Sequence, residues 1–452
     1  MSSFDRRQFL TASSAASVYL ATNRPLFFSS VNAADTLRTR PPRRTKPAAK
    51  KVALLASTYH YLSHAYHIAG RFLHGYIRAG EHHFPEWGIA SAYVEQVKPA
   101  TDLSRELAEQ FNFRRSETIE DALTLGTGKL AVDAVLLICE HGDYKYNAKG
   151  QKLYPRYEYF QEVVKVFDKS GKTVPVFCDK HLSYDRKRAA QMVAQARQMN
   201  FPLMAGSSLP VTWRRPELEF PVGTPITEAL VASRGELEIY GIHALEALQC
   251  MVERRFGKAQ PQPAQQGVKA VTCLQGDAVW KAGDDGRWSW ELLEHALGRS
   301  ISRNAGDIRD NCRRFPRPIT WGNFVKGPIA FLIEYADGLR ATVLQLDGHV
   351  ADETFAAQVK GEKKPQSCLF WLPPPPGAAF LEALSMHIES FFTSGKPPYP
   401  VERTLLTGGI LDYALESRVR DCQRLETPDL DIRYDPPTES GFLRGDYAQP
   451  VK

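Results

Sequence analysis

Most of this chain lacks paired-cysteine motifs, apolar runs long enough to span a membrane, and a large net charge of either sign. Its seven cysteines are an odd number, with no C-x-x-C pair and no metal-ligand spacing, so neither a disulfide framework nor a zinc site is indicated. After the first 34 residues no apolar run is long enough to span a bilayer. The net charge of +6 is accounted for by seven Arg and Lys residues between positions 38 and 51. The rest of the chain is therefore close to neutral, and a nucleic-acid partner is not expected.

The N-terminus is typical of a twin-arginine export signal. Arg6 and Arg7 precede a weakly apolar stretch rich in Ala and Ser, and small residues around Ala33 form a cleavage site. The sequence thus predicts a signal peptide over residues 1–34, a basic linker over 35–50, and a periplasmic or otherwise exported protein. A tail without structure and an uncleaved anchor are the alternatives.

The first half of the chain alternates predicted strands and helices. Short apolar runs predict strands at 52–56, 88–94, 132–139, 173–178 and 202–205. Runs of this length bounded by helices predict a parallel sheet covered on both faces, so residues 51–210 are expected to form a Rossmann-like, doubly wound α/β domain. Cys139 and Cys178 end two of these strands and are expected to be buried thiols.

The pattern changes after residue 210. A helix is predicted at 236–255, strands within 268–280 and 328–346, and a hairpin turn at Asp337-Gly338. Helices at 378–393 and 401–420 follow, and then an extended tail over 427–452. Residues 211–426 are therefore expected to form an α+β domain with an open, largely antiparallel sheet. One face of that open sheet must be buried against another structure. A second copy of the chain could bury it, which suggests a homo-oligomer.

Glycine is absent from one turn where a dinucleotide site needs it. The first strand leads into Ser57 and Thr58, whereas a Gly-rich turn would let the backbone approach a pyrophosphate. In an open parallel sheet, ligands bind outside the carboxyl ends of the strands. Four groups should therefore meet in one crevice: those at 57–60, 140–143, 179–181 and 206–208.

Three segments resemble a known family. They are "DAVLLICEHGDY", "VPVFCDKHLSYDRKRAAQMVAQARQMNFPLMAGSS" and "YGIHALEAL". They resemble the glucose–fructose oxidoreductase, inositol dehydrogenase and MocA family. Lys180 matches the lysine of that family's fourth-strand motif. Gly241, His243 and Glu246 stand at the positions of Gly, His and Asp in its Gly-x-His-x-x-Asp helix.

This resemblance implies a Rossmann domain that binds NAD or NADP and a hydride transfer to or from a sugar or polyol. It also implies that Lys180 orients the reacting oxygen and that His243 moves its proton. Histidine suits proton transfer because its usual pKa lies near neutrality. Ile239 stands where the family has an Asp that would orient the histidine, and Glu95 lies near its ribose-binding position. The candidate cofactor-binding residues are Ser57, Thr58, Glu140, His141 and Asp179.

Structural interpretations compete with these functional ones. A polar stripe on the first helix is explained as a solvated face; it comprises His60, His64, His67, Arg71, His74 and Arg78. Asp179 and His181 would cap the next helix, with Ser183 as its N-cap. Tyrosines at 144, 146, 154, 157 and 159, together with Trp213, could stack on sugar rings or simply pack.

The sequence therefore predicts an exported NAD(P)-dependent oxidoreductase acting on a sugar or polyol. One alternative is a carbohydrate-binding or scaffold protein without catalysis. The other is a lyase or hydrolase with a metal at Glu140, His141 and Asp143, although their spacing matches no common metal motif.

Overall fold

The computed structural model describes residues 44, 47–78, 80–257, 263–314 and 328–445. The predicted signal peptide lies outside these residues, as does most of the predicted linker. The elements from β1 onward belong to one compact unit, Lys46–Lys452. In the described part, no helix has both the length and the apolar character needed to cross a membrane.

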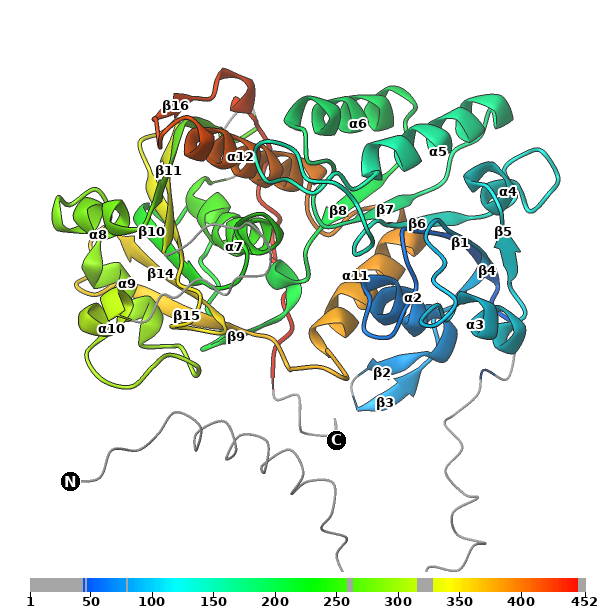
Figure 1. Ribbon diagram of the computed structural model, residues 1–452, viewed down its shortest axis with the longest axis horizontal. Coiled ribbons are helices and arrows are strands. Elements are labelled where there is room, and N and C mark those ends of the chain that lie inside the picture. The colour runs from blue at the N-terminus through cyan, green and yellow to red at the C-terminus, as the bar shows by residue number, and fades with distance from the viewer. Residues whose placement is uncertain (1–43, 45–46, 79, 258–262, 315–327, 446–452) are drawn as a thin grey trace, which may run out of the picture. The chain divides into compact units, whose positions relative to one another are not determined.

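The first sheet is parallel and has the strand order β5-β4-β1-β6-β7-β8 within the described residues (Figure 1). Its strands are β1 (Lys50–Ala56), β4 (Trp87–Val94), β5 (Arg114–Ser116), β6 (Ala134–Ile138), β7 (Val176–Asp179) and β8 (Leu203–Gly206). The order reverses between β1 and β6, so a crevice opens at their carboxyl ends. The predicted doubly wound sheet is thus confirmed.

Both faces of this sheet are buried, because alternate residues of its strands enter different cores. Val52 and Leu54 of β1 pack towards α2 (His64–His74), whereas Ala53 and Leu55 pack against the opposite helices. The remaining helices of this half are α3 (Ser104–Phe111), α4 (Ile119–Thr124), α5 (Arg156–Ser170) and α6 (Arg186–Gln198). A small hairpin, β2 (Tyr76–Arg78) with β3 (Glu81–His83), follows α2. Cys139 and Cys178 are buried as expected, and all seven cysteines are free.

The second sheet is mixed, with the order β16-β11-β12-β13-β10-β14-β15-β9 in the described residues. Its strands are β9 (Trp213–Arg215), β10 (Ile226–Ser233), β11 (Val268–Gln275), β12 (Ile329–Tyr335), β13 (Arg340–Gln345), β14 (Glu353–Val359), β15 (Gln366–Trp371) and β16 (Leu425–Glu426). Only β10 and β13 pair in parallel among these strands, so the predicted, largely antiparallel sheet is confirmed. The predicted hairpin joins β12 to β13, and Gly338 at φ 94° makes its turn.

Helices of this same chain cover both faces of the second sheet. On one face lie α7 (Leu237–Val252), which continues into η2 (Glu253–Arg255), and α12 (Val401–Val419). On the other lie α8 (Asp277–Asp284), α9 (Trp290–Leu297) and α10 (Ile308–Arg314), at the edge of the molecule in Figure 1. The face expected to need a partner subunit is therefore covered by α8–α10.

The prediction of a strand over 268–280 was wrong beyond Gln275. Gly276, at φ 63°, turns the chain, and α8 then packs Val279 and Ala282 onto the sheet, three residues apart as on one face of a helix. A short apolar run is compatible with either structure, and here tertiary packing favoured the helix.

The last helices connect the two sheets. Helix α11 (Phe380–Ser394), within the range predicted for the second domain, packs beside α2 against the first sheet through Leu384, Ile388 and Phe391 (Figure 1). The described part of the tail, after η3 (Pro428–Leu430), runs along the body. There Leu443 N donates to Val211 O at the end of η1 (Leu209–Val211).

Candidate active site

A cavity of about 670 Å³ lies where the carboxyl ends of β6, β7 and β8 meet α7 and the edge of the second sheet. Three of the four groups expected at the crevice contribute to its lining: Glu140 and His141 after β6, Asp179 and Lys180 at β7, and Ser207 after β8. A pocket of this size, apolar with a few convergent polar groups, is the usual form of a small-molecule site.

Lys180 and His243 are in contact with each other in the lining of this cavity. The Lys180 Nζ lies 3.3 Å from His243 Nε2, with Lys180 placed directly after β7 and His243 on α7. Burial, reinforced by the neighbouring Lys180, holds the pKa of His243 well below its usual value, so the imidazole is neutral. An ammonium group can only donate hydrogen bonds, so we assign the acceptor role to Nε2 and the proton to Nδ1.

Ser207 orients the His243 ring. Its hydroxyl lies 2.6 Å from His243 Nδ1, where it accepts the ring N–H. Sequence reasoning placed Ser207 at the crevice but gave it no role. It found no partner to orient His243, because Ile239 occupies the position of the expected carboxylate. The hydroxyl reaches the ring from the neighbouring strand end, and no local sequence pattern marks that contact.

Glu246 fixes the backbone that carries Ser207. This carboxylate is fully buried and accepts hydrogen bonds from Ser207 N at 2.5 Å and from Thr404 Oγ1 at 2.8 Å. Burial raises the pKa of Glu246 to about 7. Glycine is required at Gly206, which has φ 134°, because a Cβ there would lie 3.0 Å from the Glu246 carboxylate.

Glu140 is the centre of a buried charge network. It forms an ion pair with Arg156, which is fully buried, and a second with Lys180 at 3.3 Å. Burial alone would raise the pKa of Glu140, but the two cations outweigh it and hold that pKa far below its usual range. The network continues from Arg156 to His181 at 3.2 Å, and from His181 to Glu238 at 3.4 Å.

Asp179 holds a histidine and does not cap a helix. Its carboxylate, 2% exposed, lies 2.6 Å from His64 Nδ1 on α2. The predicted N-cap of α6, Ser183, was also wrong. Asp185 caps that helix by accepting from Lys187 N and Arg188 N, both at 2.9 Å.

The predicted solvated face is found only at the far end of the polar stripe, where His74 and Arg78 are exposed. His67 and Arg71 are buried, and His64 and His67 line the cavity. Arg71 donates to His67 O, and also to Gly377 O and Ala378 O of the segment that leads into α11. The prediction failed because a segment 300 residues away along the sequence packs on this helix face.

The glycine-free turn is filled by its own side chains. Ser57 is buried and donates to Glu140 O at 2.8 Å, while α2 begins only at His64, after its N-cap Ser63. Thr58 lines a second, smaller hollow of about 70 Å³ that Gln96 and Lys98 also line.

Three imidazoles lie close together beside the two hollows: His60 lines the smaller one, and His64 and His141 line the large cavity. The rings of His60 and His141 are 5.2 Å apart, and His64 lies 5.4 Å from His141. Burial lowers the pKa of His141 to about 4, and its buried Nε2 has no hydrogen-bond partner among the described residues. In a neutral imidazole this nitrogen can donate or accept a hydrogen bond, according to the tautomer.

Two of the three residues of the metal hypothesis are engaged in ion pairs with other residues. Glu140 turns to Arg156, whereas Asp143, 80% exposed, pairs with Lys98 at 2.6 Å. In the described ranges, no three His, Cys, Asp or Glu residues are arranged to hold a metal ion. Glu95, expected near a ribose, bonds the Tyr144 hydroxyl.

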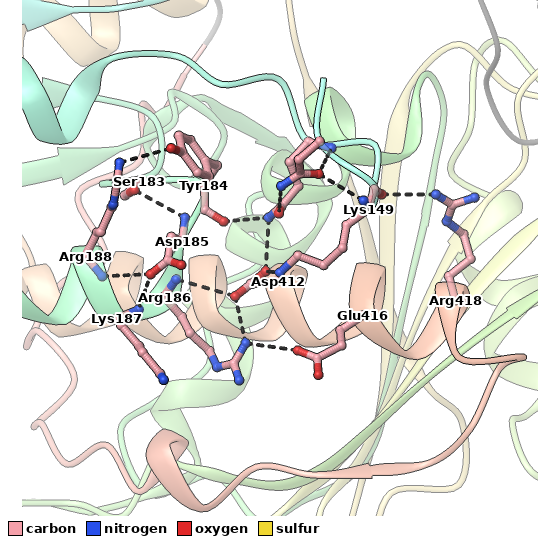
Figure 2. Close-up of polar contacts among 12 residues, drawn as sticks. Lys149, Ser183, Tyr184, Asp185, Arg186, Lys187, Arg188, Asp412, Glu416 and Arg418 are labelled. Carbon is pink, nitrogen blue, oxygen red and sulfur yellow. Dashed lines mark hydrogen bonds and ion pairs between the residues drawn. The ribbon is translucent and has the colours of Figure 1, made fainter. Parts of the chain in front are cut away.

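The long loop after β6 is held by a polar cluster on α12. Asp412 pairs with Lys149 of the loop and with Arg186 of α6, and Arg418 donates to Lys149 O (Figure 2). Of the loop tyrosines, Tyr154 lines the cavity. Trp213 packs against Trp371, 5.6 Å between ring centroids, and Trp371 is the tryptophan that lines the cavity.

Comparisons with known proteins find likeness in structure. No family model matches the chain, and no curated protein does either. GenD2 from gentamicin A biosynthesis, solved in complex with NAD, matches with a TM-score of 0.51 and 13% identity, over 86% of this chain and 99% of that one. An oxidoreductase from Agrobacterium radiobacter, in complex with NAD+, L-tartaric acid and magnesium, matches with a TM-score of 0.50 and 13% identity, over 83% and 98%. This chain thus has the fold of these two proteins, with a parallel and a mixed sheet, as the resemblance implied.

Proposed function

We propose that this protein is an NAD- or NADP-dependent oxidoreductase that moves a hydride to or from an alcohol carbon of a sugar or polyol. The observation that carries the proposal is the buried pair of Lys180 and a neutral His243 at the mouth of the sheet crevice. The fold and the NAD complexes of the similar structures support it.

The residues of the crevice fit a dinucleotide that is held by side chains. His60 lines the smaller hollow and His141 lines the large cavity, and their rings are 5.2 Å apart, so the two spaces adjoin. The unpartnered His141 Nε2 can donate to a pyrophosphate that the glycine-free turn cannot approach closely. The Ser57 hydroxyl already donates its hydrogen bond to Glu140 O. Its proposed role in cofactor binding is therefore to shape the turn and not to donate to the cofactor.

The chain's own groups divide the work of the reaction. A bound nicotinamide supplies the hydride acceptor or donor. Lys180 donates a hydrogen bond to the reacting oxygen, and His243 Nε2 takes the hydroxyl proton during oxidation and returns it during reduction. Glu140 lies 3.3 Å from Lys180 and offsets the positive charge that protonation of His243 would add.

Export remains a proposal from the sequence. The twin-arginine pattern predicts transport of the folded protein to the periplasm, where a tightly held nicotinamide would be an advantage. Fractionation of cells that make the full chain, compared with an Arg6→Lys and Arg7→Lys variant, tests this location.

The first experiment is to denature the purified protein and to look for released NAD or NADP by mass spectrometry. We expect a cofactor in the protein, or binding of added cofactor by calorimetry. Lys180→Met and His243→Gln should keep that binding and lose about a hundred- to ten-thousand-fold in turnover. The exposed Lys187→Met on α6 is the control and should retain activity.

An empty protein that binds neither NAD nor NADP would overturn the oxidoreductase proposal. The carbohydrate-binding protein without catalysis would then be favoured, since the filled, glycine-free turn already fits it.

A further inference from the structure

One side of the large cavity is apolar, opposite in character to the side that carries Lys180 and His243. We call this the apolar side; its main members are Phe370, Trp371, Leu372, Phe380, Leu381 and Leu384. They come from the end of β15, the segment after it and the start of α11. The polar side comprises Glu140, Lys180, Ser207 and His243, from the first sheet and α7. Arg234, Ser302, Asp352 and Glu353 also line the cavity, from the second sheet and the segments beside it.

The apolar side is held in place by contacts outside the cavity. Arg71 of α2 donates to Gly377 O and Ala378 O, at 2.9 and 3.1 Å, and so fixes the segment before α11. The guanidinium of Arg215 lies 3.9 Å from the centroid of the Trp371 ring, and Thr212 donates to Trp371 O at 2.7 Å. This surface is therefore formed before any ligand arrives.

An exposed apolar side chain also lines the cavity. Ile301, in the segment after α9, is 76% exposed.

A free sugar or polyol suits only the polar side. It carries a hydroxyl on nearly every carbon, and hydroxyls against Leu372, Phe380 and Leu384 would lose their hydrogen bonds to water without replacement. A substrate with an apolar substituent removes that conflict, since the substituent leaves water at the apolar side while the hydroxyls meet Lys180 and His243.

We infer that the substrate is a carbohydrate or polyol that bears an apolar group, of the class of alkyl and aryl glycosides, with that group seated against the apolar side. This inference rests on the proposed function, and it specifies the substrate class of the same site. The reacting alcohol carbon lies at Lys180 and His243, and the glycosidic bond takes no part in the reaction.

The test is calorimetric binding of matched glycoside pairs to the full protein, both as purified and with added NAD. The probes are the phenyl and methyl glycosides of glucose, galactose and mannose, which share a ring and differ in the apolar group. We expect the phenyl glycoside of at least one sugar to bind about ten- to a hundredfold more tightly than its methyl partner.

Two leucine variants locate the binding of the phenyl group. Leu372 and Leu425 are both partly buried and both pack against the same core of the second sheet, but of these two only Leu372 lines the cavity. Leu372→Ser should reduce the phenyl preference to near unity, and Leu425→Ser should leave it unchanged.

Equal binding of phenyl and methyl glycosides, or no binding of any phenyl glycoside, would overturn the inference. The inference would also be overturned if Leu372→Ser weakened the binding of NAD but not that of phenyl glycosides, because the apolar side would then hold the nicotinamide. Hydride transfer from free sugars without a phenyl preference would leave the proposed function standing. If the protein preferred phenyl glycosides but bound neither NAD nor NADP, the proposed oxidoreductase function would be contradicted. The inferred class of ligand would still be supported.

Discussion

The two sides of the cavity are built on different physical principles. The polar side is a set of buried groups that depend on one another, since Glu140, Arg156, Lys180, His243 and Ser207 are linked by successive contacts. The apolar side is a surface whose members contribute separately through the area they cover. Changes on the polar side should therefore affect folding and chemistry together, whereas changes at the half-buried members of the apolar side, such as Leu372, should affect mainly ligand binding.

Removal of the fully buried cation that pairs with Glu140 should give the largest effect. Arg156→Met leaves Glu140 with Lys180 as its remaining cationic partner in the described network, in a site where both ends of the lost ion pair are nearly inaccessible. Breaking a buried pair in this way lowers the free energy of unfolding by about 3–5 kcal/mol. Urea denaturation measures the loss.

The control for this comparison is Arg188→Met, which removes an exposed ion pair with Glu158. Exposed pairs contribute about 0–1 kcal/mol, so this variant should be nearly as stable as the wild type. Equal losses in the two variants would mean that the network around Glu140 does not depend on its charge.

Glu246→Gln should reveal an intermediate, pH-dependent effect. The pKa of Glu246 is raised by burial from 4.5 to about 7, so between these values the folded protein holds a proton that the unfolded chain releases. The contribution of Glu246 to stability is thus fully present below pH 4.5 and is lost as the pH rises towards 7 and above. The Gln variant has no such loss and should gain about 2 kcal/mol relative to the wild type between pH 5 and 8.

Denaturation curves at pH 5 and pH 8 for both proteins measure that gain. Glu162→Gln, at an exposed site that pairs with Lys165, is the control variant. A stability difference between Glu246→Gln and the wild type that does not change with pH would contradict a raised pKa at Glu246.

The smallest effect is expected at Ser207. Ser207→Ala removes the acceptor of the His243 Nδ1 proton, so turnover should fall about tenfold with little change in KM, which corresponds to the loss of one hydrogen bond of about 1.4 kcal/mol. The pH profile of turnover should shift as well, because the hydroxyl also stabilises protonated His243.

Two neighbouring variants separate positioning from mere structure. Ser207→Thr keeps a hydroxyl and should restore most of the activity. Ser208→Ala changes another serine that lines the cavity and should leave the pH profile unchanged. If Ser207→Ala behaves like Ser208→Ala, then Ser207 does not orient the histidine.

Much of the first sheet could be predicted from local pattern. Five of its strands lie within two or three residues of the predicted ranges, since continuous apolar runs such as that of β6 are suited to burial on both faces. The convergence of Glu140, Lys180 and Ser207 followed from the same pattern, because parallel strands end at one edge. Helix α8 was missed, as its first apolar residues continue the pattern of the strand before it.

The interactions around the site were harder to predict. Arg71 and His67 were expected in water, and Asp179 was expected at a helix end. In each case the true partner lies far along the sequence: Gly377 and Ala378 for Arg71, and His64 for Asp179. A single sequence contains no signal for such pairs, which depend on how finished elements pack.

By itself, the sequence determined the two kinds of sheet, the edge at which the polar residues meet, and the absence of glycine from the first turn. These follow from residue order, from the period of apolar positions, and from the rule that parallel strands point the same way. Only the tertiary structure decided that Ser207 orients His243, that α8–α10 cover the second sheet, and that α11 forms an apolar side to the cavity. Those outcomes depend on contacts between segments tens to hundreds of residues apart, whose formation is governed by packing of the whole chain and not by local preference.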